Sequence, residues 1–268
     1  MDNFICVTCG TQFAQTAEVP EHCPICTDER QYVGYDGQQW TTLLDLKKDR
    51  RNRIEQQENN LYGIGTDPKF AIGQRALLVC SAQGNVLWDC ISLIDDATIG
   101  RVKALGGLSA VAISHPHYYA SAVEWAHAFD IKVYLHAADR MWIMRPDSSI
   151  EFWEGETLTR SEELTLIKAG DHFDGGTVCH WRSGAAEAGV LLTGDVIQVV
   201  ADKCWVSFMY SYPNYIPLSA AKVGDIESAV EPYAFDRLYG AWWPAIVVSN
   251  AKERVNLSAA RYIKALQC

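Results

Sequence analysis

The chain has 268 residues, of which 49% are hydrophobic, and its formal net charge is −10 at pH 7. These values suit one large buried core with a small accessory module, and they argue against nucleic-acid partners, which are bound through clustered Lys and Arg. No apolar stretch approaches the length of a membrane-spanning helix, so no membrane partner is expected. The chain begins Met-Asp-Asn, without the basic and apolar regions of a signal peptide, which favours a cytoplasmic location.

Two Cys-x-x-Cys pairs come first along the chain, Cys6 with Cys9 and Cys23 with Cys26. At this spacing four thiolates can converge on one ion, and Gly10 permits the tight turn that directs backbone N–H groups at sulfur. We therefore expect a metal-held module over residues 1–36. The pairs, with the Pro-Glu-x-Cys-Pro stretch around Cys23, resemble a zinc ribbon or the rubredoxin-like module of rubrerythrins, and this resemblance implies Zn²⁺ or iron. Disulfides would be the alternative in an oxidising compartment.

Five further cysteines are scattered through the chain: Cys80, Cys90, Cys179, Cys204 and Cys268. An odd and scattered set is typical of reduced, mostly buried thiols. We assign none of them to catalysis.

Residues 37–60 are expected to connect the module to the main domain. A helix is predicted over residues 41–59, and its apolar side chains are Leu43, Leu44, Leu46 and Ile54. Their spacing predicts that the connector packs onto the main domain.

From residue 61 to residue 268, predicted strands and helices alternate. We expect strands at 74–80, 86–89, 111–114, 133–135, 164–168, 177–182 and 189–192. We expect helices at 95–105, 121–129, 218–230 and 251–266. A Gly84-Asn85 turn signals a hairpin, which indicates antiparallel strand pairs among layered helices.

Four residues in this region are candidate metal ligands. His115 and His117 close the strand at 111–114, His172 lies on a Gly/Asp-rich turn, and Asp195 ends the strand at 189–192. Paired imidazoles from one strand end, a third from a loop and a carboxylate can hold Zn²⁺ or iron with an open position for water.

The order of these residues resembles the metallo-β-lactamase superfamily, over roughly residues 61–268. That resemblance implies an α/β fold, a four-layer αβ/βα sandwich, here preceded by the small four-cysteine metal ribbon. The family loop His-x-His-x-Asp-His keeps its first two histidines, but Tyr119 and Ala120 replace its last two residues, and no histidine follows His180. The resemblance therefore implies one intact ion position, with Asp89 supporting the histidine loop through hydrogen bonds.

The function that the resemblance implies is a metal-dependent hydrolase with an atypical, mononuclear site. His115, His117 and His172 would hold the ion, while Asp195 would complete the coordination or act as the base. Tyr119 would donate a hydrogen bond to an oxyanion or leaving group. The expected substrate is a small ester, thioester, lactone or related carbonyl compound.

Two other functions remain open from the residues. The first is an iron-dependent redox or electron-transfer protein, in which an iron-loaded cysteine module serves an iron in the main domain. The second is a member of the fold that binds a metal or ligand without catalysis. The sequence does not fix the oligomeric state.

Overall fold

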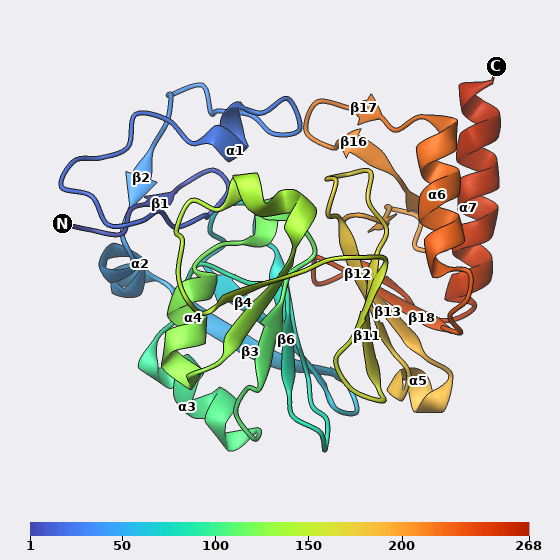
Figure 1. Ribbon diagram of the computed structural model, residues 1–268, viewed down its shortest axis with the longest axis horizontal. Helices are drawn as coiled ribbons and strands as arrows, with labels where there is room; N and C mark the ends of the chain where they lie inside the picture. Colours follow the sequence, from blue (N-terminus) through green and yellow to red (C-terminus); the bar gives the residue numbers. More distant parts are fainter. Residues whose placement is uncertain (268) are drawn as a thin grey trace. The chain divides into compact units, whose positions relative to one another are not determined.

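The computed structural model describes residues 1–267 (Figure 1). Cys268, one of the five scattered cysteines, lies outside the described residues. The chain divides into two compact units, the N-terminal unit (Met1–Leu135 with Arg140–Phe152) and the C-terminal unit (His136–Asp139 with Trp153–Cys268). The boundaries expected from the sequence, at 1–36, 37–60 and 61–268, stay predictions.

The N-terminal unit is built on a seven-stranded sheet with the order β3-β4-β5-β6-β7-β8-β9. Its strands are β3 (Arg51–Glu58), β4 (Leu61–Asp67), β5 (Arg75–Val79), β6 (Val86–Trp88), β7 (Ala110–Ala112), β8 (Lys132–His136) and β9 (Ile150–Trp153). Strands β3 to β6 pair antiparallel, whereas β6, β7 and β8 pair parallel. Parallel neighbours need a crossover connection. Helices α3 (Asp96–Ala104) and α4 (Ala122–Phe129) provide the two crossovers.

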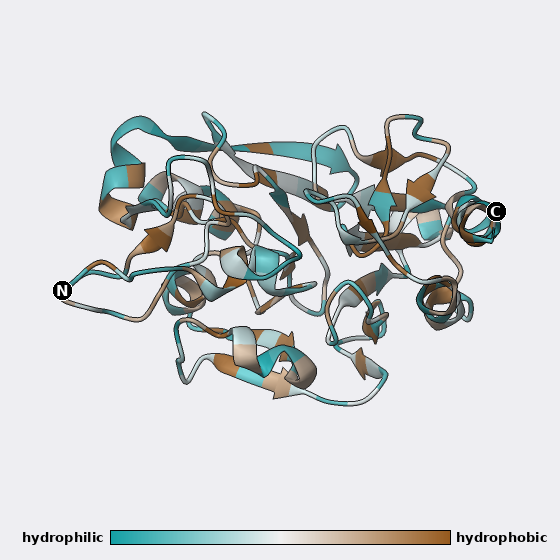
Figure 2. Ribbon diagram, turned by 90° about the horizontal axis from the view of Figure 1, so that it is seen from above, coloured by the Kyte–Doolittle hydropathy of each residue, from teal (hydrophilic) through white to brown (hydrophobic). Residues whose placement is uncertain are grey.

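The cysteine segment and its connector form small elements in the same unit: β1 (Ile5–Cys6), α1 (Pro24–Thr27), β2 (Trp40–Thr41) and α2 (Leu43–Asp49). The helix predicted over 41–59 is wrong beyond Asp49, because Arg50 is extended and β3 begins directly after it. Strand β3 lies at the sheet edge and buries only Ile54. It is mostly hydrophilic (Figure 2), as suits an edge strand that must not pair with other chains. In α2, Leu46 is buried as expected, but Leu44 is 72% exposed.

The C-terminal unit contains a six-stranded sheet with the order β10-β11-β12-β13-β18-β19. Its strands are β10 (Thr157–Thr159), β11 (Leu164–Lys168), β12 (Thr177–Trp181), β13 (Val190–Gly194), β18 (Arg237–Gly240) and β19 (Ile246–Val247). Helices α6 (Ala220–Val230) and α7 (Ala251–Leu266) lie side by side in Figure 1. Apolar side chains of both helices, such as Val223 and Val255, are buried with Leu191 and Leu238 of the sheet.

Smaller elements complete the two units: η1 (Pro116–Tyr118), η2 (Ala137–Trp142), α5 (Gly184–Glu187), β14 (Gln198–Val199), β15 (Val206–Ser207), β16 (Met209–Ser211) and β17 (Ile216–Pro217). Each unit thus carries helices on a sheet, and the predicted α/β class is confirmed. Within residues 1–267, no helix is both long enough and apolar enough to span a bilayer.

Candidate metal centres

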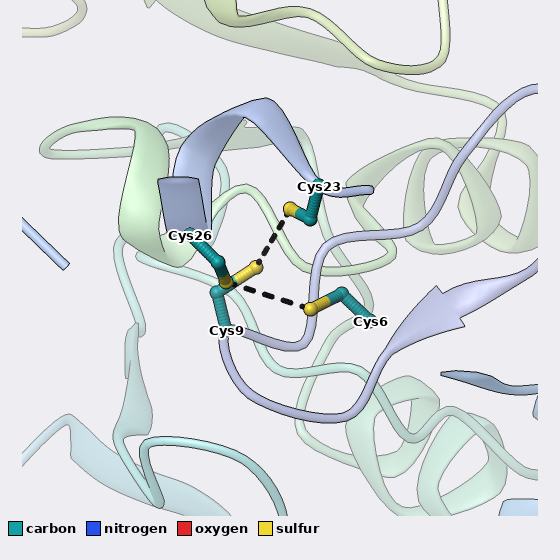
Figure 3. Close-up of side chains that lie close together, drawn as sticks. All are labelled: Cys6, Cys9, Cys23 and Cys26. Carbon is teal, nitrogen blue, oxygen red and sulfur yellow. Dashed lines mark hydrogen bonds between the residues drawn. The ribbon is translucent and has the colours of Figure 1, made fainter. Parts of the chain in front are cut away.

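The four cysteines of the N-terminal module converge, and their thiols point toward one another (Figure 3). All four are buried, and their sulfur atoms lie within 4.8 Å of one another. The Sγ atoms of Cys6 and Cys26 are 3.5 Å apart, and those of Cys9 and Cys23 are 3.7 Å apart. Four sulfurs placed tetrahedrally at about 2.3 Å from Zn²⁺ are about 3.8 Å from one another. The spacing therefore fits a single ion.

Each cysteine pair is shaped by local backbone hydrogen bonds. Gly10 has a φ of +85°, which favours glycine, and its N–H donates to the Cys6 carbonyl over 2.8 Å. The second pair brackets the start of α1, where Pro24 occupies the first turn and the Cys26 N–H donates to the Cys23 carbonyl over 3.0 Å. Two short turns thus present two sulfurs each.

Gln38 joins the two cysteine pairs, although no motif in the sequence points to it. Its Nε2 donates to Cys6 Sγ over 3.2 Å, while its Oε1 accepts from the Cys23 N–H over 3.2 Å. A neutral amide that donates to sulfur favours the thiolate form. Gln38 therefore both spans the cluster and stabilises negative charge on Cys6.

Crowding of four buried thiols perturbs their acidity. Hydrogen bonding with Cys23 lowers the pKa of Cys6 and raises the pKa of Cys9 and of Cys26, and burial adds to both increases. One thiolate is thus favoured while its neighbours stay protonated, because adjacent buried negative charges repel. A divalent cation would remove this conflict by pairing with several thiolates at once.

The histidine loop, residues 114–120, follows β7 in the N-terminal unit. Asp89 is buried just after β6, and its Oδ1 accepts from the Ser114 N–H over 2.8 Å and from the Ser114 hydroxyl over 2.7 Å. Ser114 Oγ also lies 2.9 Å from His115 Nδ1. Since the single hydroxyl proton is given to Asp89, Ser114 accepts from His115 Nδ1–H. The lone pair of the neutral His115 ring is then on Nε2.

His117 lies on η1, beside His115. Both side chains are buried, and their ring centroids are 5.1 Å apart. Pro116 begins this short helix, where its missing N–H costs nothing. Further along the loop, Tyr119 is 6% exposed and lines a small cavity of about 30 Å³ in this unit, large enough for one or two water molecules.

His172 stands on the loop between β11 and β12 in the C-terminal unit. Its Nδ1 lies 2.9 Å from the carbonyl oxygen of Met209 in β16. A carbonyl can only accept, so Nδ1 is the donor and the lone pair of the neutral ring is again on Nε2. Asp139, which is buried, holds the same loop by accepting from the Gly175 N–H over 2.9 Å. Neither Met209 nor Asp139 carried a recognisable motif in the sequence.

Asp195 directly follows β13 and is 6% exposed. Gly194 before it has a φ of +57°, which turns the chain sharply at the strand end. Tyr212 belongs to the same unit, and its ring centroid lies 5.8 Å from that of His172. Burial, followed by the negative charge of Asp195, raises the pKa of Tyr212 well above its usual value. Tyr212 therefore stays protonated and donates to the Ser207 carbonyl over 2.9 Å.

One curated relative is similar over nearly the whole chain. The chain is 52% identical over 268 residues to the uncharacterized protein YmaE of Bacillus subtilis (strain 168), an alignment covering 99% of this chain and 97% of YmaE. No protein-family model matches the chain.

Solved structures with a similar fold include two metallo-β-lactamases and VMB-1. The DIM-1 metallo-β-lactamase has a TM-score of 0.59 at 14% identity, covering 80% of this chain and 98% of its own. VMB-1 has a TM-score of 0.58 at 14% identity, with 81% and 98% covered. The metallo-β-lactamase FIM-1 from Pseudomonas aeruginosa, in a mono-zinc form, has a TM-score of 0.58 at 15% identity, with 80% and 96% covered.

Proposed function

Because this chain belongs to the family of YmaE and has the metallo-β-lactamase fold that its sequence predicted, we propose that it is a metal-dependent hydrolase. His115, His117 and His172 are a group of side chains able to hold one ion, and we propose that they do so. The ion is Zn²⁺ or iron.

The main support for this proposal is a pair of hydrogen-bond contacts at the Nδ1 atoms of two imidazoles. His115 and His172 each commit Nδ1 as a donor, the first to Ser114 Oγ and the second to the Met209 carbonyl. Metal-binding histidines in proteins almost always use their other ring N–H in this way, which fixes the ring and directs its lone pair. The remaining ring nitrogen of each is Nε2, and the candidate ligand atoms of the three histidines all lie within 4.8 Å of one another.

The donor set fits hydrolytic chemistry. An ion held by these histidines would supply Lewis-acid polarisation of a carbonyl and would lower the pKa of a bound water toward neutrality. We propose that Asp195 either completes the coordination or accepts the proton of the attacking water, since a buried carboxylate at a strand end suits either role. We propose that Tyr119 donates a hydrogen bond to the oxygen that gains negative charge.

We further propose that the site holds a single ion and acts on carbonyl substrates. Tyr119 and Ala120 offer no ligands equivalent to the family Asp and His, and the chain has no histidine after His180. The mono-zinc form of FIM-1 is a single-ion example within the same fold. Without a second ion, the two-metal clamp on a phosphodiester is missing. Small esters, thioesters and lactones are therefore the proposed substrates.

The four-cysteine cluster is proposed to hold Zn²⁺, with iron as the other candidate. The cytoplasm is proposed as the location, because none of the eight cysteines within residues 1–267 forms a disulfide.

Hydrolysis of an ester, thioester and lactone panel, with and without chelator, tests the function. We expect chelator-sensitive turnover that His117→Ala abolishes together with loss of one ion per chain. His127→Ala is the matched control, because this exposed histidine pairs with Asp147 at the surface and should leave both readouts unchanged. Full activity of a metal-free His117→Ala protein would contradict the proposal.

The same preparation separates the two alternative functions. A redox protein would contain iron in the cysteine cluster, and its ferric form would be red, whereas Zn²⁺ is colourless. A protein that only binds ligands would retain its ion at the histidines and show no turnover on the whole panel.

A further inference from the structure

The first cysteine pair is hydrogen-bonded to the end of the histidine loop, within the N-terminal unit. The Gln12 N–H, three residues after Cys9, donates to the carbonyl oxygen of Ala120 over 2.9 Å. Gln12 is 3% exposed, so this bond is shielded from water. A bond that joins two segments so far apart in sequence restrains the loop only while the cysteine turn is itself fixed.

A second connection runs in parallel through two buried serines. Ser92 donates its hydroxyl to the Gly10 carbonyl over 2.7 Å, and Ser121 donates its hydroxyl to the Ser92 carbonyl over 2.7 Å. Gly10 directly follows Cys9, and Ser121 directly follows the histidine loop. The C-terminal end of the loop is thus tied to the cysteine turn twice, at Ala120 and at Ser121.

The side chain of Gln12 adds a partly buried polar cluster. Its Oε1 accepts from Arg145, its Nε2 donates to Glu124 over 3.3 Å, and Arg145 donates to Glu124 over 2.5 Å. Glu124 lies in the first turn of α4, the helix that begins just after the histidine loop. The ion pair of Arg145 and Glu124 is mostly shielded from water, so these bonds help to hold Gln12 against α4.

The backbone of the histidine loop needs such support. Ala120 has a φ of +46°, a left-handed conformation that is strained for alanine. Strained residues persist only where surrounding contacts hold them. The Gln12 N–H contacts the carbonyl of this same residue, so the cysteine turn holds the loop at its strained point.

We infer that the metal-filled cysteine module positions the histidine loop, with Gln12 as the positioning residue. An ion at the four cysteines fixes the turn that carries Gly10 and Gln12, and this turn fixes the loop that presents His115 and His117. Occupancy of the cysteine cluster therefore raises the affinity of the histidine group for its own ion, and by linkage the reverse holds. The inference about affinity rests on the proposed function, whereas the inference about loop order does not.

Hydrogen exchange of residues 113–122 in Cys9→Ser measures loop order without any ion at the histidines. Loss of the cysteine-bound ion should speed exchange in this segment by about tenfold or more, the effect of losing one buried hydrogen bond. Cys204→Ser, a change at an exposed cysteine outside the module, should leave it unchanged. Unaltered exchange in a Cys9→Ser protein that has lost its ion would overturn the inference.

Gln12→Ala tests the side-chain part of the coupling, in a protein whose cysteine cluster keeps its ion. The variant loses the contacts of Gln12 with Arg145 and Glu124 and keeps the backbone N–H that donates to Ala120. We expect its affinity for Zn²⁺ at the histidines to fall about tenfold in competition with a chromophoric chelator. Gln15→Ala is the control, because Gln15 belongs to the same module but bonds only the exposed Met1 carbonyl. Adding Ala120→Gly, which relieves the left-handed strain, should recover part of the loss.

The outcomes separate the two proposals. If the wild-type chain binds an ion only at its cysteines, the proposal that it is a hydrolase is wrong. The hydrogen-exchange experiment would still test whether the cysteine module positions the histidine loop. If Gln12→Ala binds Zn²⁺ at the histidines as tightly as the wild type does, the Gln12 side chain does not position the loop, and the role given to that side chain is wrong.

Discussion

Among single residues, the hydrogen-bond partners of the candidate metal ligands determine how those ligands are oriented. Asp89 and Ser114 together orient His115, and Met209 orients His172. Each partner also selects which ring nitrogen bears the lone pair. Loss of such a partner should therefore weaken metal binding without unfolding the chain.

Ser114→Ala tests this directly. The change removes the acceptor for His115 Nδ1–H, so the ring loses both its orientation and its fixed tautomer. We expect the affinity for Zn²⁺ at the histidines to fall about 10- to 100-fold, measured by chelator competition. Ser114→Thr retains the hydroxyl and should recover most of the affinity. Equal affinities for the alanine variant and the wild type would show that Ser114 does not orient His115.

Gln38→Glu tests the cysteine cluster in the same way. The substitution removes the donor to Cys6 Sγ and places a carboxylate beside the thiolates, where like charges repel. We expect Co²⁺ to bind more weakly at the four cysteines and the thiolate-to-metal charge-transfer spectrum to change. The affinity for an ion at the histidines should fall less, because Gln38 acts on that site only through the cysteine module. If the spectrum and the Co²⁺ affinity are identical to those of the wild type, Gln38 does not stabilise the cysteine thiolates.

Among the elements, the sequence predicted local patterns and the convergence of its motif residues, but not the contacts of residues outside those motifs. The cysteine turns followed from Cys-x-x-Cys spacing, and the strand before His115 followed from its apolar run. Strand β3 was mistaken for a helix because its polar sequence has no period-two apolar face, which an edge strand does not need. Gln12 and Gln38 were missed because their partners are distant in sequence, 112 residues away in the case of Glu124.

Strand β12 contains a buried titratable group, His180, that makes stability depend on pH. Burial holds the pKa of His180 below its usual 6.5, and its Nε2 donates to the Ala234 carbonyl over 2.8 Å. The unfolded chain therefore takes up the proton first as pH falls, so the stabilisation is complete above about pH 6.5 and is lost progressively below it.

His180→Gln should flatten this dependence. Glutamine keeps a donor for the Ala234 carbonyl but does not titrate. Urea unfolding between pH 7.5 and 5 should then show a smaller decrease in the free energy of unfolding for the variant than for the wild type. Equal slopes for the two proteins would mean that His180 does not remain neutral in the folded state.

For the molecule as a whole, we propose two ions per chain, one in the four-cysteine cluster and one at three histidines. The first assignment rests on sulfur spacing that fits a tetrahedral ion. The second rests on two imidazoles whose tautomers are set for metal binding. The whole-chain similarity to YmaE suggests that both centres be measured in that protein too.

Anomalous diffraction at the zinc and iron edges from crystals of the wild-type protein would locate both proposed ions. We predict one peak among the four cysteine sulfurs and a single second peak bound by Nε2 of His115, His117 and His172. No peak at the histidines would contradict the proposed hydrolase. A further peak about 3.5 Å from the second, with protein ligands of its own, would contradict the single-ion site.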